Sequence, residues 1–80
     1  MNTMFTITDD GRTEQTAFRL NVAEQTFMMF DVDNKTWVDV TEQYFGSDNP
    51  ADYAANIQET KLTFVAFGWM LPNDTIEVIK

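Results

Sequence analysis

The pattern of apolar and polar residues is densest over residues 62–71, where eight of ten residues are hydrophobic and none is charged. Ten residues are too few to cross a bilayer as a helix, which takes about 20, so this run belongs in a protein core. Its β-branched and aromatic residues favour a strand, and Gly68 is costly inside a helix. A turn cluster follows at residues 72–74, and alternation returns over residues 75–80. We therefore predict a β-hairpin over residues 62–80, with a central first strand and a bulge at Gly68.

The apolar pattern predicts further strands earlier in the chain, joined by short turns; most of them alternate, and the one at residues 26–32 is apolar on both faces. These strands are expected at residues 4–8, about 16–22, 26–32 and 36–40. Residues 13–25 fit either an amphipathic helix or a strand. We favour the strand because Phe18, Leu20 and Val22 alternate with other residues. The pattern up to residue 40 is that of a four-stranded meander.

Helix signals follow the meander. Residues 42–45 fit a single helical turn that ends at Gly46. A longer helix is predicted at about residues 50–60, because Asp48 or Asn49 can cap it and Pro50 suits its first position. Its apolar stripe consists of Tyr53, Ala54 and Ile57. The fold class expected is α+β, with one domain over residues 1–80 in which a small antiparallel β-sheet of about five to six strands packs against this helix.

Catalytic and metal-binding chemistry has few candidate residues. The chain has no cysteine and no histidine, which removes thiolate metal sites, disulfides and the commonest general base. Ser47 is the sole serine, and it lies in the turn before the predicted helix. We expect no enzymatic activity and no cofactor.

One stretch partly matches a calcium-binding loop. Asp31, Asp33, Asp39 and Glu42 occupy positions one, three, nine and twelve of that pattern. Lys35 then falls at position five, where an oxygen ligand belongs, and Thr36 replaces the glycine required at position six. We expect these acids to flank a hairpin turn and to bind no metal.

Charge is the most informative property of the composition. The net charge is −8, which disfavours direct binding to nucleic acid or to anionic membranes and favours a basic partner. Six acids lie within residues 31–52 against the single base Lys35. Asp31 and Asp33 on one strand face would be about 6–7 Å apart, close to the spacing of neighbouring phosphates. Trp37 and Tyr44 add possible aromatic anchors.

The leading hypothesis is a small acidic protein-binding module that inhibits a larger protein by occupying its basic, nucleic-acid-binding site as a nucleic-acid mimic. The expected partner is an enzyme such as a nuclease, and the residues expected to contact it are Asp31, Asp33, Trp37, Asp39, Glu42, Tyr44, Asp48 and Asp52. In size and charge the chain resembles the small acidic inhibitors that phages encode against host nucleases, glycosylases or CRISPR effectors. This resemblance is one of general type, and no sequence motif supports it.

Two other hypotheses remain. The chain could be a structural subunit that pairs with a copy of itself or with a larger assembly, in which case its charge only keeps it in solution. It could also carry a small molecule among its methionine and phenylalanine side chains. The N-terminus lacks a basic start and an apolar segment, so we expect a cytoplasmic protein.

Overall fold

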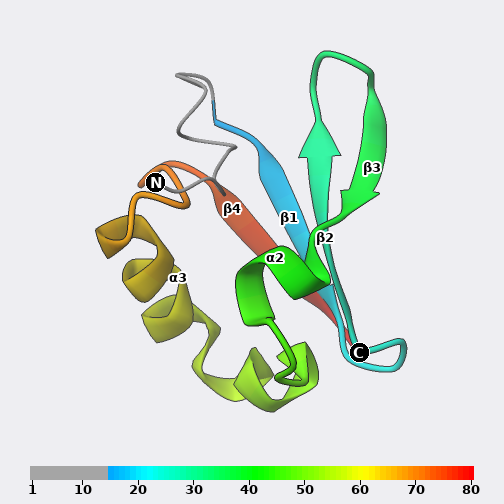
Figure 1. The fold of residues 1–80 in the computed structure, drawn as a ribbon, viewed down its shortest axis with the longest axis vertical. Helices are drawn as coiled ribbons and strands as arrows, with labels where there is room; N and C mark the ends of the chain where they lie inside the picture. The colour runs from blue at the N-terminus through cyan, green and yellow to red at the C-terminus, as the bar shows by residue number, and fades with distance from the viewer. Residues whose placement is uncertain (1–14) are drawn as a thin grey trace.

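A mixed four-stranded sheet forms one layer of the computed structural model, which describes residues 15–80 (Figure 1). Its strands are β1 (Ala17–Asn21), β2 (Thr26–Asp31), β3 (Thr36–Asp39) and β4 (Thr75–Ile79). They lie in the order β3-β2-β1-β4, so β3 and β4 form opposite edges of this sheet. β1 pairs with β2, and β2 with β3, in antiparallel fashion, whereas β1 and β4 run parallel. The fold is α+β.

The apolar pattern and the short turns predicted three of these strands correctly. β1, β2 and β3 form the expected meander, and residues 17–21 are a strand rather than part of a helix. The strand predicted at residues 4–8 lies outside the described residues. The expected total of five to six strands is not matched, because residues 15–80 contain four, and the sheet is mixed rather than antiparallel.

Helices occupy the connection from β3 to β4: α2 (Thr41–Phe45), the 3-10 helix η1 (Pro50–Asn56) and α3 (Ile57–Ala66). Strands that run parallel need a long crossover connection, usually a helix. β4 runs in the same direction as β3 but lies at the other edge of the sheet, so the connecting helices cover one face of the sheet (Figure 1).

The helix start predicted near residue 50 is present. The Asn49 side chain accepts a hydrogen bond from the Ala51 backbone N–H at 2.9 Å, and Pro50 takes the first helical position. The short turn α2 is also present, followed by Gly46 with a positive φ of 62°. The expected helix over residues 50–60 has different bounds, because η1 holds its first part and α3 continues to Ala66.

Aromatic rings dominate the core between the sheet and the helices. Phe18, Leu20 and Phe27 are fully buried on the helical side of the sheet. Phe27 lies in contact with rings from α2 and α3, at centroid distances of 5.1 Å to Phe45 and 6.3 Å to Phe64. Burying a side chain of this size stabilises the fold by about 1.5–3 kcal/mol. These few rings therefore attach the helical layer to the sheet.

The prediction of a buried central strand over residues 62–71 is wrong. The first five of these residues belong to α3, in which Phe64 is 5% exposed while Leu62 is 67% exposed. Phe67, which ends the helix, is 60% exposed. A run that is apolar on both strand faces is equally compatible with a helix. Here the helix places one large ring in the core and leaves other apolar residues at the surface.

Gly68 directly follows the C-cap residue of α3 and does not form a strand bulge. Its φ of 82° is the left-handed conformation that follows many helices. The Gly68 N–H donates to the Val65 carbonyl at 3.0 Å, and the Trp69 N–H donates to the Phe64 carbonyl at 2.9 Å. This pair of bonds is a Schellman motif, and the stacked Phe64 and Trp69 rings, 5.7 Å apart, supply its apolar contact.

Asp74 connects the last turn to the sheet. The carboxylate is fully buried, and its two oxygens accept hydrogen bonds from the backbone N–H groups of Thr16, at 2.9 Å, and Leu71, at 2.8 Å. The turn over residues 72–74 was predicted, and β4 follows it as expected. The partner of β4 is β1, however, and not the preceding apolar run.

Candidate functional site

The predicted partner-binding residues do not all share one surface, and Tyr44 is not at the surface. This side chain is 6% exposed and packs against Phe18 and Phe27 with ring centroids 5.5 and 5.4 Å away. Its hydroxyl donates a hydrogen bond to the Trp69 carbonyl at 2.7 Å. Tyr44 is a core residue, so it is unavailable as an aromatic anchor for a partner.

Asp31 and Asp33 lie at the β2–β3 turn. Asp31 is the last residue of β2, and its carboxylate accepts hydrogen bonds from the Asn34 side-chain amide at 2.8 Å and from the Asn34 and Asp33 backbone N–H groups. The side-chain amide of Asn34, and then its backbone N–H, lower the pKa of Asp31 from its ordinary value of 3.8. Asp33 is in the turn and not on the strand, so the predicted phosphate-like spacing along one strand face is wrong.

Asp39 and Glu42 lie where β3 passes into α2. Asp39 ends β3, and one of its carboxylate oxygens accepts a hydrogen bond from the Thr41 backbone N–H at 2.9 Å. Glu42 is in the first turn of α2. Both side chains are exposed, and the hydrogen bond from the Thr41 N–H favours one orientation of the Asp39 carboxylate.

Asp48 and Asp52 belong to the helical layer. Asp48 precedes η1 and accepts a hydrogen bond from the Tyr53 hydroxyl at 2.7 Å. That bond, together with the negative charge of Asp48, raises the pKa of Tyr53 above its ordinary value of 10.0. Asp52 is exposed in the first turn of η1. The six acids therefore form three pairs along the chain, at the hairpin turn, at the β3–α2 junction and at the start of η1.

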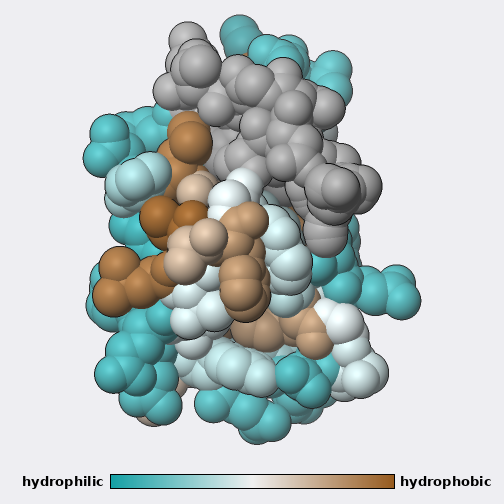
Figure 2. Space-filling view, turned by 60° about the vertical axis from the view of Figure 1, so that its left-hand side comes forward, coloured by the Kyte–Doolittle hydropathy of each residue, from teal (hydrophilic) through white to brown (hydrophobic). Residues whose placement is uncertain are grey.

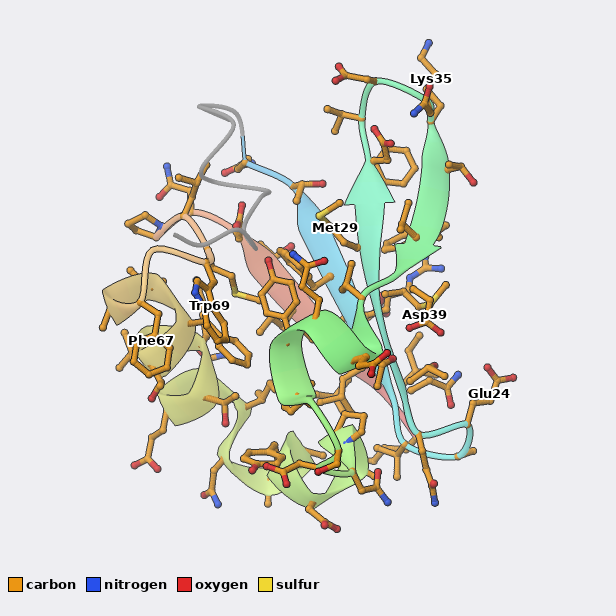
Figure 3. All side chains as sticks on the ribbon, in the orientation of Figure 1. Glu24, Met29, Lys35, Asp39, Phe67 and Trp69 are labelled. Carbon is orange, nitrogen blue, oxygen red and sulfur yellow. The ribbon has the colours of Figure 1, made fainter. Side chains whose placement is uncertain are left out.

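None of the six acids forms an ion pair with another described residue. The ion pair within residues 15–80 joins Arg19 Nε to Glu77 Oε1 at 3.4 Å, and it involves other residues. Lys35, the single base within residues 31–52, sits in the β2–β3 turn (Figure 3). Among residues 15–80, therefore, no base forms an ion pair with these acids.

The sheet face opposite the helices carries a groove. Alternate residues of each strand point away from the core. The register places Arg19 between Met28 and Glu77, and Met28 beside Asp39, on this outer face. A groove of about 420 Å³ lies here, lined by Arg19, Asn21, Glu24, Thr26, Met28, Trp37, Asp39 and Ile79. Asp39 and Glu24 lie on the same side of the molecule (Figure 3).

Trp37 forms part of this groove and is held in place by its neighbours. The Arg19 guanidinium lies 4.2 Å from the centroid of the Trp37 ring. The Phe30 ring packs against the same indole with centroids 5.2 Å apart. The sheet therefore brings together Trp37 and Asp39, two of the predicted residues.

Sequence reasoning did not identify the other groove residues. Arg19, Glu24 and Met28 were assigned no role, although Arg19 alternates with Phe18 and Leu20 along its strand. Ile79 lines the groove because β4 pairs with β1. That parallel pairing has no local signal in the sequence.

Neither a metal-binding cluster nor a membrane-spanning helix is found among residues 15–80. These residues contain no group of three or more acidic side chains arranged to hold a metal ion. The helices in this part of the chain are too short or too polar to span a membrane. No family model, no curated protein and no solved structure matches the chain.

Proposed function

We propose that this chain is a small protein-binding module that docks on a basic surface of a larger protein and occludes a nucleic-acid-binding site there. The observation that carries the proposal is the unneutralised charge of residues 31–52, which hold six acids and a single base. Acids that were already paired with bases inside the module would attract a basic partner only weakly. Free carboxylates instead steer a basic partner and pair with it on contact.

Local hydrogen bonds give two of these acids a further advantage. The Asp31 carboxylate is held by the β2–β3 turn, and the Asp39 carboxylate is held by the Thr41 N–H. Ordering a side chain at an interface costs about 0.5–1.5 kcal/mol, and a side chain that is already ordered avoids this cost. The hairpin and the β3–α2 junction therefore present negative charge from fixed positions.

The proposal is tested by affinity capture with matched variants. The double variant Asp33→Asn with Glu42→Gln removes the charge of two exposed carboxylates. Neither carboxylate accepts a hydrogen bond from another described residue. Glu59→Gln, on the surface of α3, is the control for loss of a charge elsewhere. We expect a basic protein captured from lysate of the encoding organism by the wild type and Glu59→Gln, but weakly by the double variant. Binding should also weaken steeply as salt is raised.

The occlusion step needs a second measurement on the captured protein. Fluorescence anisotropy of a labelled oligonucleotide would report whether the wild-type module displaces nucleic acid from it. Displacement by the wild type, with much weaker displacement by the double variant, supports the proposal. A partner that binds the module and the oligonucleotide simultaneously, or that is captured equally at high salt, contradicts it.

A second candidate function is that of a structural subunit, because α3 and the residue that follows it expose apolar side chains. Leu62 and Phe67 are 67% and 60% exposed, and hydrophobic side chains gather on the surface when the α3 side faces the viewer (Figure 2). A surface of this kind can join copies of one chain. Light scattering tests self-assembly, since a measured mass of 9.2 kDa that does not change with protein concentration would exclude it.

A further inference from the structure

The groove on the outer face of the sheet combines an apolar lining with two unpaired acids. Met28, Trp37 and Ile79 contribute apolar surface, and Glu24 and Asp39 contribute carboxylates. One oxygen of Asp39 accepts the Thr41 N–H, and its other oxygen accepts no hydrogen bond from the described residues. The Glu24 carboxylate likewise accepts none from them.

The charge around the groove favours a cation. Arg19 is paired with Glu77, so this base is already balanced by an acid on the neighbouring strand. Glu24 and Asp39 then leave an excess of negative charge in the groove. Lys35 lies at the far end of the β2–β3 hairpin from both acids (Figure 3).

The protein itself shows that a guanidinium fits this surface. Arg19 places its guanidinium 4.2 Å from the centroid of the Trp37 ring, within the range of a cation–π interaction. Guanidinium groups are planar, weakly hydrated and able to pair with carboxylates through two N–H groups. An incoming arginine would lay its aliphatic stem along the apolar lining and direct its guanidinium to the carboxylates.

We propose that this groove binds an arginine side chain of a basic polypeptide, with Asp39 and Glu24 as the pairing carboxylates and Trp37, Met28 and Ile79 as the apolar contacts. This inference rests on the proposed function insofar as both require a basic partner. It differs in the residues that it uses, because the capture variants at Asp33 and Glu42 leave the groove intact.

The test uses a defined peptide, acetyl-Gly-Arg-Gly-amide, and its citrulline counterpart, which keeps the shape of arginine without the charge. In a Trp69→Phe background Trp37 is the remaining indole, so its fluorescence reports on the groove. We expect a saturable change with the arginine peptide and binding at least tenfold weaker with the citrulline peptide. Backbone amide shifts in the wild-type protein should map to the strands that line the groove.

Matched variants separate the groove from general charge attraction. Asp39→Asn keeps an oxygen for the Thr41 N–H but removes the charge, and Glu24→Gln removes the second charge. Each should weaken binding of the arginine peptide several-fold, whereas Glu59→Gln on α3 should not change it. The inference would be overturned if the citrulline peptide bound as tightly as the arginine peptide, or if Glu59→Gln weakened binding as much as the groove variants. Amide shifts confined to other surfaces would overturn it as well.

The two proposals fail in distinguishable ways. If the arginine peptide occupies the groove but the Asp33 and Glu42 variants capture partners normally, the proposed function is wrong and the groove assignment stands. If those variants lose capture while the arginine peptide does not bind, the groove assignment alone is wrong.

Discussion

Replacing Asp74 by alanine should destabilise this protein more than replacing any exposed acid. The carboxylate is fully buried and accepts the backbone N–H groups of Thr16 and Leu71. These bonds join the start of β1 to the turn before β4, beside the parallel pairing of the two strands. Alanine would leave both N–H groups without their acceptor.

The magnitude follows from the two lost acceptors. A buried donor left without a partner costs about 1–3 kcal/mol. Thr16 is buried, and the hydrogen bond to Leu71 is partly buried, so we expect a total of roughly 3 kcal/mol. In a domain of this size each kcal/mol lowers Tm by about 4–8 °C, which gives a decrease of roughly 12–24 °C.

Thermal and urea unfolding followed by circular dichroism would measure this loss. Asp74→Asn keeps one acceptor oxygen and should lose about half as much stability as Asp74→Ala. Glu59→Ala, at an exposed position on α3, should change the free energy of unfolding by about 0.5 kcal/mol or less. A loss below about 1 kcal/mol in Asp74→Ala would show that water satisfies both N–H groups and would refute this reasoning.

Two further predictions concern α3 and the hairpin turn. Phe64→Ala should cost about 3–5 kcal/mol and Leu62→Ala about 0.5 kcal/mol or less in urea unfolding, because α3 buries the first side chain and exposes the second; equal losses would contradict the helix. Carboxyl NMR titration should place the pKa of Asp31 below 3.8, and Asn34→Ala should raise it, since the Asn34 amide is the largest cause of the shift. A group whose pKa is lowered by folding stabilises the protein at pH values above its pKa in the unfolded state, so this contribution is lost as the pH falls through the folded pKa of Asp31. An unchanged titration midpoint of Asp31 in Asn34→Ala would refute the assignment.

The sequence by itself determined the elements whose signals are local. The apolar pattern and the short turns over residues 17–39 were sufficient for β1, β2 and β3, because the strands of a meander pair with their immediate neighbours. Asn49 and Pro50 indicated the start of η1, since a cap satisfies backbone groups two or three residues away. Trp37 and Asp39 were placed at the surface by the same local pattern.

The tertiary structure decided what depended on contacts between distant residues. Residues 62–66 are apolar enough for a strand or a helix. The helix is the form in which Phe64 packs against Phe27 and Trp69. β4 pairs with β1 although the helices separate the two strands in the sequence, and this pairing puts Ile79 beside Asn21 in the groove. Local sequence patterns report on neighbours along the chain. They carry no information about which strand an edge residue will meet, so the groove could be found only in the folded protein.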